Sequence, residues 1–297
     1  MINTNPVASP FACALDIGAA LGESPVWSVD EQVLYFVDIR APSLNRFDPA
    51  SGRNVAMAMP SSIGCFALRQ RGGFIVALRD GIWLADRNGA LERRVADAPY
   101  DVAHHRFNDG RCDLQGRFFA GSMNENRDAE TAQLVRIDTD FQMTQVLSGM
   151  TISNGLAWSP DGRTMYHADT PTRSIRAFDY DGASGTPSNP RVFASFAGAT
   201  ERPDGGAVDS AGNYWTAFFH GGKVVQLSPR GEILDELPVP AMCPTMCAFG
   251  GPQLRTLYVT SARGGRSAEE LARLPQSGGV FALEVDTPGR PEPRFAG

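Results

Sequence analysis

Four polar residues occupy matching positions in a repeated pattern of short apolar segments. Each is expected just before the first of two apolar runs, eight or nine residues before the turn between them: they are Glu23, Asn108, Asn154 and Asp204. Two carboxylates and two amides supply only oxygen ligands, which suit a hard divalent cation such as Ca²⁺, Mg²⁺, Mn²⁺ or Fe²⁺. Zn²⁺ stays a candidate only as an open site, because no Cys or His completes a closed one. Asparagine is also common in turns, so the shared position of all four favours a site.

The turns themselves recur at a regular spacing. They fall at intervals of 41 to 50 residues, at Gln32, Gly73, Gly116, Gly162, Gly212 and Arg255. A third short apolar run follows each pair. A period of roughly 40–50 residues with several short strands is typical of propeller blades. The sequence therefore predicts an all-β fold, a six-bladed β-propeller of four-stranded antiparallel blades, forming a single domain over residues 1–297.

Two segments outside the repeat have predicted places in this fold. The apolar segment 11–16 precedes the first hairpin, and we expect it to complete the last blade and so hide an open edge. The segment 267–274 carries a capping box, Ser267 with Glu270, and ends before Pro275. This pattern predicts one short helix inserted in the sixth blade.

A propeller would bring the four polar residues together. The first strand of each blade lines the central channel, so residues at one position of the repeat form a ring at one mouth. Facing carboxylates repel unless a cation lies between them. Arg106 points the same way by strand alternation. We expect the loops after each second strand to face this mouth as well; they are 38–40, 123–126, 169–170 and 220–221. The four histidines show no triad-like setting and are expected to be structural or rim residues.

Composition excludes several classes of protein. The net charge is −6, and without a basic run nucleic acid is not an expected partner. No apolar run approaches the length of a membrane span. The five cysteines cannot all pair with each other, and small buried residues in a reducing cytoplasm are the expectation. The first twenty residues do not resemble a signal peptide. Nucleophile-elbow, phosphate-loop and dinucleotide motifs are absent from the sequence.

Several segments of the chain resemble the signatures of the gluconolactonase/regucalcin family, which includes senescence-marker-protein-like sugar lactone lactonases. They are Leu21–Trp27, Arg106–Gly110, Phe119–Met123, Ser153–Trp158, Arg202–Gly205 and Glu269–Ala272. The resemblance implies a six-bladed propeller holding one divalent metal ion through Glu23, Asn154 and Asp204. It also implies substrate contacts from Arg106 and Asn108, with Glu125 as the nearest match to a further acidic contact.

The activity implied by the resemblance is hydrolysis of a sugar (aldono-) lactone to its aldonic acid, in the oxidative catabolism of sugars. Asp204 is the expected general base, with a metal-bound water as the alternative. Two other functions stay open: a regucalcin-like propeller that binds calcium or a ligand without turnover, and a phosphotriesterase-like hydrolase. The expected partner is a small-molecule sugar lactone, and the oligomeric state, monomer included, is open.

Overall fold

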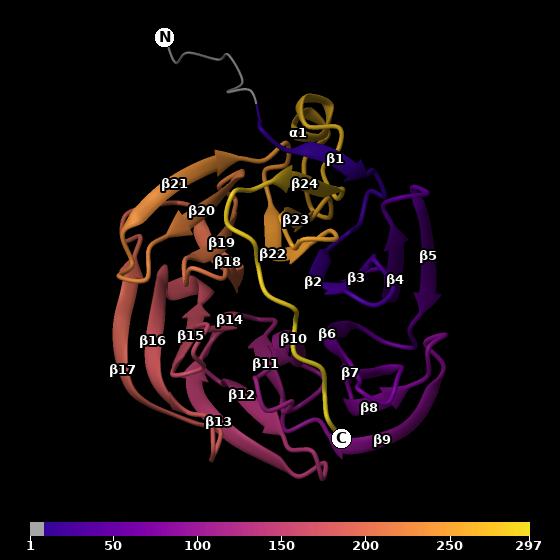
Figure 1. Ribbon diagram of the computed structural model, residues 1–297, viewed down its shortest axis with the longest axis vertical. Helices are drawn as coiled ribbons and strands as arrows, with labels where there is room; N and C mark the ends of the chain where they lie inside the picture. The colour runs from indigo at the N-terminus through magenta and orange to yellow at the C-terminus, as the bar shows by residue number, and fades with distance from the viewer. Residues whose placement is uncertain (1–8) are drawn as a thin grey trace.

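A computed structural model describes residues 9–297 of the chain, and its strands form six four-stranded antiparallel sheets arranged as a propeller around a central channel (Figure 1). The predicted fold is confirmed. Each sheet is one blade, numbered here in the order of its innermost strand. Ordered outward from the channel, five blades follow the chain, whereas the sixth takes its outermost strand from the N-terminal segment.

The strands of the blades have the following bounds. Blade 1 contains β2 (Gly22–Ser28), β3 (Val33–Asp38), β4 (Ser43–Asp48) and β5 (Arg53–Ala58). Blade 2 contains β6 (Ile63–Leu68), β7 (Phe74–Leu78), β8 (Gly81–Ala85) and β9 (Leu91–Asp97). Blade 3 contains β10 (His105–Cys112), β11 (Phe118–Asn124), β12 (Ala132–Ile137) and β13 (Met143–Met150). Blade 4 contains β14 (Ser153–Trp158), β15 (Thr164–Asp169), β16 (Ser174–Asp181) and β17 (Thr186–Ser195). Blade 5 contains β18 (Arg202–Val208), β19 (Tyr214–Phe219), β20 (Lys223–Leu227) and β21 (Ile233–Pro238). Blade 6 contains β22 (Pro244–Gly250), β23 (Thr256–Ser261), β24 (Val280–Glu284) and β1 (Ala12–Leu15).

The N-terminal strand closes the ring. β1 pairs antiparallel with β24, with Cys13 opposite Phe281, so the first and last strands of the described chain share blade 6. This confirms the predicted closure, which removes an exposed sheet edge. A 3₁₀ turn, Thr170–Thr172, follows β15. The one α-helix among residues 9–297, α1 (Ala268–Arg273), lies between β23 and β24, and its cap is the predicted one: the Ser267 side chain accepts a hydrogen bond from the Glu270 amide. No helix of residues 9–297 has both the length and the apolar character needed to span a membrane.

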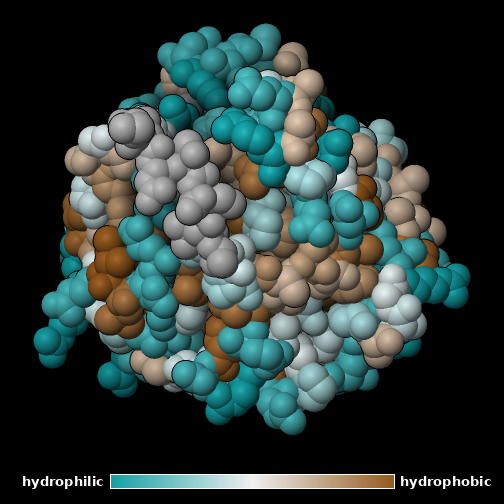
Figure 2. Space-filling model, turned by 90° about the horizontal axis from the view of Figure 1, so that it is seen from above, coloured by the Kyte–Doolittle hydropathy of each residue, from teal (hydrophilic) through white to brown (hydrophobic). Residues whose placement is uncertain are grey.

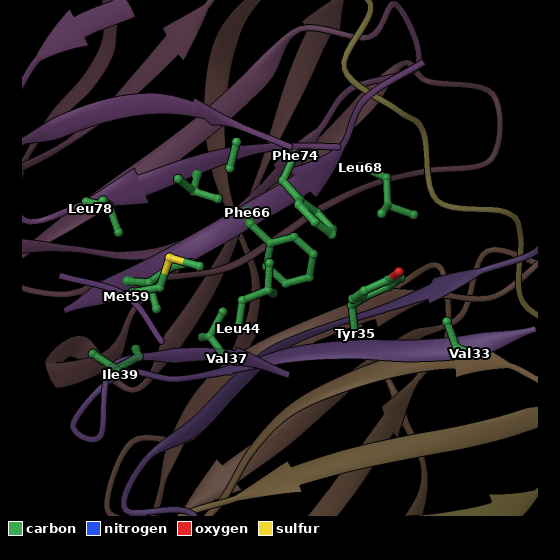
Figure 3. Close-up of a cluster of buried hydrophobic side chains, with 13 residues drawn as sticks. Val33, Tyr35, Val37, Ile39, Leu44, Met59, Phe66, Leu68, Phe74 and Leu78 are labelled. Carbon is green, nitrogen blue, oxygen red and sulfur yellow. The ribbon is translucent and has the colours of Figure 1, made fainter. Parts of the chain in front are cut away.

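The hydrophobic core lies between neighbouring blades. Between blades 1 and 2, Tyr35 meets Phe74 edge to face with ring centroids 5.2 Å apart, and Phe66 packs against both (Figure 3). Trp27 stacks on Tyr258 at 5.7 Å between blades 1 and 6. Aromatic pairs of this geometry add to the burial of apolar area. On the outer side shown in Figure 2, hydrophobic residues lie scattered among hydrophilic ones.

Each innermost strand breaks its pairing with the second strand at a β-bulge near its first residues. The shifts lie at Glu23–Val26 in β2, Ile63–Cys65 in β6, Phe107–Gly110 in β10, Asn154–Ala157 in β14, Pro203–Gly206 in β18 and Pro244–Cys247 in β22. A bulge redirects side chains and strengthens the local twist. In β14 it places Gly155 at a φ of 62°, and a Cβ there would lie 2.5 Å from the Tyr214 hydroxyl oxygen. Glycine therefore fits where a larger residue would clash.

The C-terminal segment crosses the channel at the mouth where the innermost strands end (Figure 1). Its backbone bonds to hairpin turns of several blades: the Ser210 amide donates to Pro288, the Gln70 amide to Phe295, and the Ala296 amide to Gly116. Arg111, near the end of β10, donates a hydrogen bond of 2.6 Å to Glu292 of this segment. The channel is therefore covered at one mouth and open at the other.

Candidate functional site

A cavity of about 630 Å³ opens at the uncovered mouth. The beginnings of the innermost strands and the loops after the second strands line it, as the sequence predicts. Glu23, Asn108, Asn154 and Asp204 all contribute to its wall, together with Arg106 and Glu125. The four ring residues were expected just before their strands. They lie inside β2, β10, β14 and β18, at or within the bulges, which turn their side chains towards the axis.

The two asparagines belong to one hydrogen-bonded chain across three blades. The Asn108 amide donates to the Asn154 side-chain oxygen at 2.9 Å and to the Ser153 carbonyl at 3.0 Å. The Asn154 amide donates to the Thr170 hydroxyl at 2.8 Å, which in turn donates to the Pro203 carbonyl. These bonds fix the orientation of both amides, and a carbonyl oxygen has a second lone pair for a ligand.

The carboxylates of the ring are buried with few hydrogen-bond partners. Glu23 and Asp204 are each 6% exposed. Glu23 accepts only from the amide of Ser24, and Asp204 accepts no hydrogen bond from a donor within residues 9–297. Burial raises the pKa of Glu23 well above its usual range, and repulsion from Asp204 adds to this. Burial, followed by repulsion from Asp109, does the same to the pKa of Asp204.

This arrangement fits a bound cation. A positive ion between two buried carboxylates would offset both their desolvation and their repulsion. The described residues contain no group of three or more His, Cys, Asp or Glu side chains placed to hold a metal. A cation at this mouth would therefore need an amide oxygen beside the two carboxylates, and Asn154 presents one.

Arg106 and Glu125 face each other on the blade 3 side. The Arg106 Nη1 donates to the Asn108 side-chain oxygen and to the Phe107 carbonyl, both at 2.8 Å, and its Nε lies 3.7 Å from Glu125. Burial lowers the pKa of Arg106 to about 10, so it remains charged at neutral pH. Hydrogen bonds from Arg79 at 2.7 and 3.1 Å lower the pKa of Glu125.

Sequence reasoning missed most of the basic residues in this cavity. Besides Arg106, five arginines line it: Arg40, Arg79, Arg127, Arg202 and Arg266. The signal for two of them was present, since Arg40 lies in a loop expected at this mouth and Arg202 begins one of the family-like segments. Arg79 directly follows β7, the second strand of blade 2. It would have been found if the loop after that strand had also been expected to face this mouth. Thr170, which positions Asn154, lies in an expected loop as well.

The histidines take different places. His167 is buried and bonds the Ser153 hydroxyl at 2.8 Å through its Nε2, and burial lowers its pKa to about 4. It is therefore a neutral part of the core. His220 lies on the cavity rim, between Arg266 and Cys243. Four of the cysteines are buried and Cys13 is half-buried, all of them free thiols.

Comparison with known proteins identifies the family. Residues 21–263 match the SMP-30/gluconolactonase/LRE-like region, and the chain belongs to this family of propeller proteins. It is 51% identical over 287 residues to the 6-deoxy-6-sulfogluconolactonase of Pseudomonas putida, covering 96% of this chain and 98% of that protein. It is 34% identical to human regucalcin, covering 91% of this chain and 93% of regucalcin.

Solved structures agree on the architecture. A calcium-binding regucalcin from Agrobacterium tumefaciens superposes with a TM-score of 0.92 at 28% identity, covering 97% of this chain and 99% of that one. A gluconolactonase from Xanthomonas campestris gives a TM-score of 0.73 at 20% identity, covering 94% of this chain and 89% of that one. At that identity the likeness shows the shared fold alone. The family and the fold inferred from the sequence are thus confirmed.

Proposed function

We propose that the protein hydrolyses a sugar lactone to its aldonic acid in the open-mouth cavity, assisted by one divalent cation held by Glu23, Asn154 and Asp204. The observation that carries this proposal is the 51% identity to a sulfogluconolactonase along nearly the whole chain. The buried pair of carboxylates beside an oriented amide oxygen supports the cation. When bound, such an ion polarises the lactone carbonyl and makes a water more acidic.

The chain's own residues supply orientation and proton transfer. Arg106 uses Nη1 on Asn108 and Phe107, while its Nη2 makes no hydrogen bond to residues 9–297 and is free to donate to a substrate oxygen. Its positive charge stabilises negative charge developing on the carbonyl oxygen. The Asn108 amide nitrogen is occupied by Ser153 and Asn154, so Asn108 holds Arg106 and Asn154 in place as well as bordering the substrate.

Asp204 is the proposed general base. It takes a proton from the attacking water while the water oxygen bonds to the carbonyl carbon. The bond from that carbon to the ring oxygen then breaks, and the ring oxygen receives the proton back from Asp204. The product is the open-chain aldonic acid, which loses its own proton at neutral pH. No oxidant or second substrate is required.

A lactonase panel tests this function. Protein stripped of metal and then reloaded with Ca²⁺, Mg²⁺, Mn²⁺, Zn²⁺ or Fe²⁺ is assayed on pentonolactones, hexonolactones, 6-deoxy-6-sulfogluconolactone and a phosphotriester. We expect reloaded protein to hydrolyse at least one sugar lactone well above its spontaneous rate, and stripped protein to lose this activity. Tight cation binding without turnover of any lactone would favour a binding protein, and turnover of the phosphotriester alone would favour a phosphotriesterase.

A further inference from the structure

The open-mouth cavity carries more positive charge than hydrolysis of a neutral lactone needs. Six arginines line it against three acidic residues, Glu23, Glu125 and Asp204, in a chain whose net charge is −6. A cleft of one charge sign attracts ligands of the opposite sign and raises their local concentration. The excess is therefore a property of this mouth and not of the surface as a whole.

Half of these arginines are paired with acids. Arg79 and Arg106 both face Glu125, at 2.7 and 3.7 Å, and Arg266 lies 3.7 Å from Glu270. The other three, Arg40, Arg127 and Arg202, form no ion pair or side-chain hydrogen bond with any residue in 9–297. The Nε atoms of Arg202 and Arg266 are also buried without an acceptor. A buried donor without a partner is costly, which favours a ligand that supplies acceptors.

Arg202, Arg266 and His220 form a cluster on blades 5 and 6. Arg266 Nη1 donates to His220 Nδ1 at 3.1 Å, so the neutral ring carries its proton on Nε2 as a further donor. Burial and the charges of Arg266, Arg202 and Arg127 lower the pKa of His220, keeping the ring neutral. His220 itself has a φ of 65°, a conformation uncommon for a residue with a side chain.

This cluster lies across the channel from the carbonyl-binding residues. In a six-bladed ring, blade 5 is opposite blade 2 and blade 6 is opposite blade 3. Arg79 lies on blade 2 and Arg106 on blade 3, whereas Arg202 and Arg266 come from blades 5 and 6. A sugar lactone with its carbonyl near Arg106 would direct its far end towards Arg202 and Arg266.

We propose that Arg202, Arg266 and His220 form a subsite for a strongly acidic anion, a sulfonate or a phosphate monoester, on the end of the lactone away from the carbonyl. The proposal rests on the lactone hydrolysis proposed above. Guanidinium groups bind tetrahedral anions through paired hydrogen bonds, and a hydroxyl group at the same place would leave their charge unbalanced. A sulfonate carries one negative charge, whereas a phosphate monoester carries nearly two at neutral pH.

The test measures discrimination between substrates. kcat/KM is determined for gluconolactone and for its 6-deoxy-6-sulfo and 6-phospho derivatives, with wild type, Arg202→Gln and Arg266→Gln. We expect wild type to prefer an anionic lactone, and each variant to reduce the anionic-to-neutral ratio of kcat/KM by ~10- to 100-fold, the size of a lost charged hydrogen bond. Arg53→Gln removes the same charge from an exposed position on β5 and is the matched control.

Direct binding separates this proposal from the proposed function. Calorimetry with gluconate, 6-deoxy-6-sulfogluconate and 6-phosphogluconate requires no turnover. Weaker binding of the sulfonate or phosphate by Arg202→Gln, with Arg53→Gln unchanged, supports the subsite even if no lactone is hydrolysed. The relative affinities of the two anions show which group the site takes. Equal binding of gluconate and of its 6-sulfo and 6-phospho counterparts by wild type, or an unchanged ratio of these affinities in both variants, would overturn the subsite while leaving lactone hydrolysis intact.

Discussion

The two mouths of the channel are built from the two ends of the same strands. They differ in how many hydrogen bonds their buried charged side chains make. At the open mouth, Glu23 and Asp204 are both buried. Among residues 9–297, the Ser24 amide donates one hydrogen bond to Glu23, and no donor reaches Asp204. At the covered mouth, Arg111 is equally buried, but it donates to Glu292 at 2.6 Å and to the Gly206 carbonyl at 2.8 Å. We therefore expect the ligand at the open mouth, where two buried carboxylates have almost no hydrogen-bond donors.

Two aspartates of blade 5 show the contrast most directly. Asp204 lies at the bulge of β18 and accepts nothing from residues 9–297, whereas Asp209, just beyond the other end of β18, accepts from the Ala211 and Asn213 amides and from Trp215 Nε1. Both side chains are buried. Asp209 therefore stabilises the turn after β18, whereas Asp204 is left without a donor and is the one we expect to bind a ligand.

The largest effect is expected from replacing Asp204. Asp204→Asn should lose the bound cation and lower kcat/KM by ~10²–10⁴-fold, because it removes a ligand and the base. Its metal-free melting temperature should not fall, since Asp204 accepts no hydrogen bond from residues 9–297 that the substitution would break. Metal analysis, kinetics and thermal unfolding check this.

Asp209→Asn is the matched control at the covered mouth. It should keep the cation and the activity of the folded protein but lower the free energy of unfolding by about 1–3 kcal/mol, since hydrogen bonds to a buried acceptor are lost. The contrast between the two mouths fails if Asp209→Asn loses the metal while Asp204→Asn retains it.

Removing the acid of the C-terminal segment tests the covered mouth by itself. Glu292→Ala leaves Arg111 buried without its partner and should lower the free energy of unfolding by about 3 kcal/mol. Denaturant titration measures this, and kcat/KM at a temperature where the variant is folded should match wild type. A large loss of activity without a loss of stability would mean that the covered mouth takes part in the reaction.

A smaller effect is expected at Arg106. Arg106→Ala should keep the metal and reduce transition-state binding by about 1–3 kcal/mol, because a charged hydrogen bond to the substrate is lost. Asn108→Ala should also keep the metal. Its metal affinity should fall modestly, because the hydrogen bond that orients Asn154 is lost. If either variant loses its metal as fully as Asp204→Asn, the division between metal ligands and substrate contacts is wrong.

The smallest effect concerns pH. The pKa values of Glu23 and Asp204 are raised in the folded protein from ordinary values of 4.5 and 3.8. The folded metal-free state therefore holds protons that the unfolded state has released. Its stability from these groups is fully present below the unfolded values and falls as pH rises through the folded ones. Asp204→Asn should flatten this slope in unfolding measured from pH 4 upwards, as should a saturating cation, which requires deprotonated ligands. A slope unchanged in both would place the titration elsewhere.

The repeat explains why so much of the fold could be predicted. Six turns at similar intervals, from Gln32 to Arg255, define the blades, and closure through the segment 11–16 follows from the edge that a ring must hide. The outermost strands were not located one by one, because strands such as β17 face solvent and lack an apolar run; Val192 in it is 67% exposed.

The ring residues, Arg106 and Glu125 were predicted at this mouth, whereas most of the arginines in its wall were not. Glu23, Asn154 and Asp204 share one position of the repeat, which a pattern can reveal. The bulges that orient them depend on local backbone geometry and leave no periodic signal. Arg127 and Arg266 come from loops whose course no repeat determines, and the C-terminal segment 289–297 has no strand pattern to indicate that it covers the channel.

The central claim, a cation at the open mouth, has one direct test. Crystals of the protein reloaded with Mn²⁺ are measured near the manganese absorption edge, and anomalous difference maps locate the ion independently of any refined ligand set. We predict one strong peak in the open-mouth cavity, within bonding distance of oxygens from Glu23, Asn154 and Asp204, and its loss in Asp204→Asn. Absence of a peak at saturating Mn²⁺, or a peak away from these three side chains, would contradict the account.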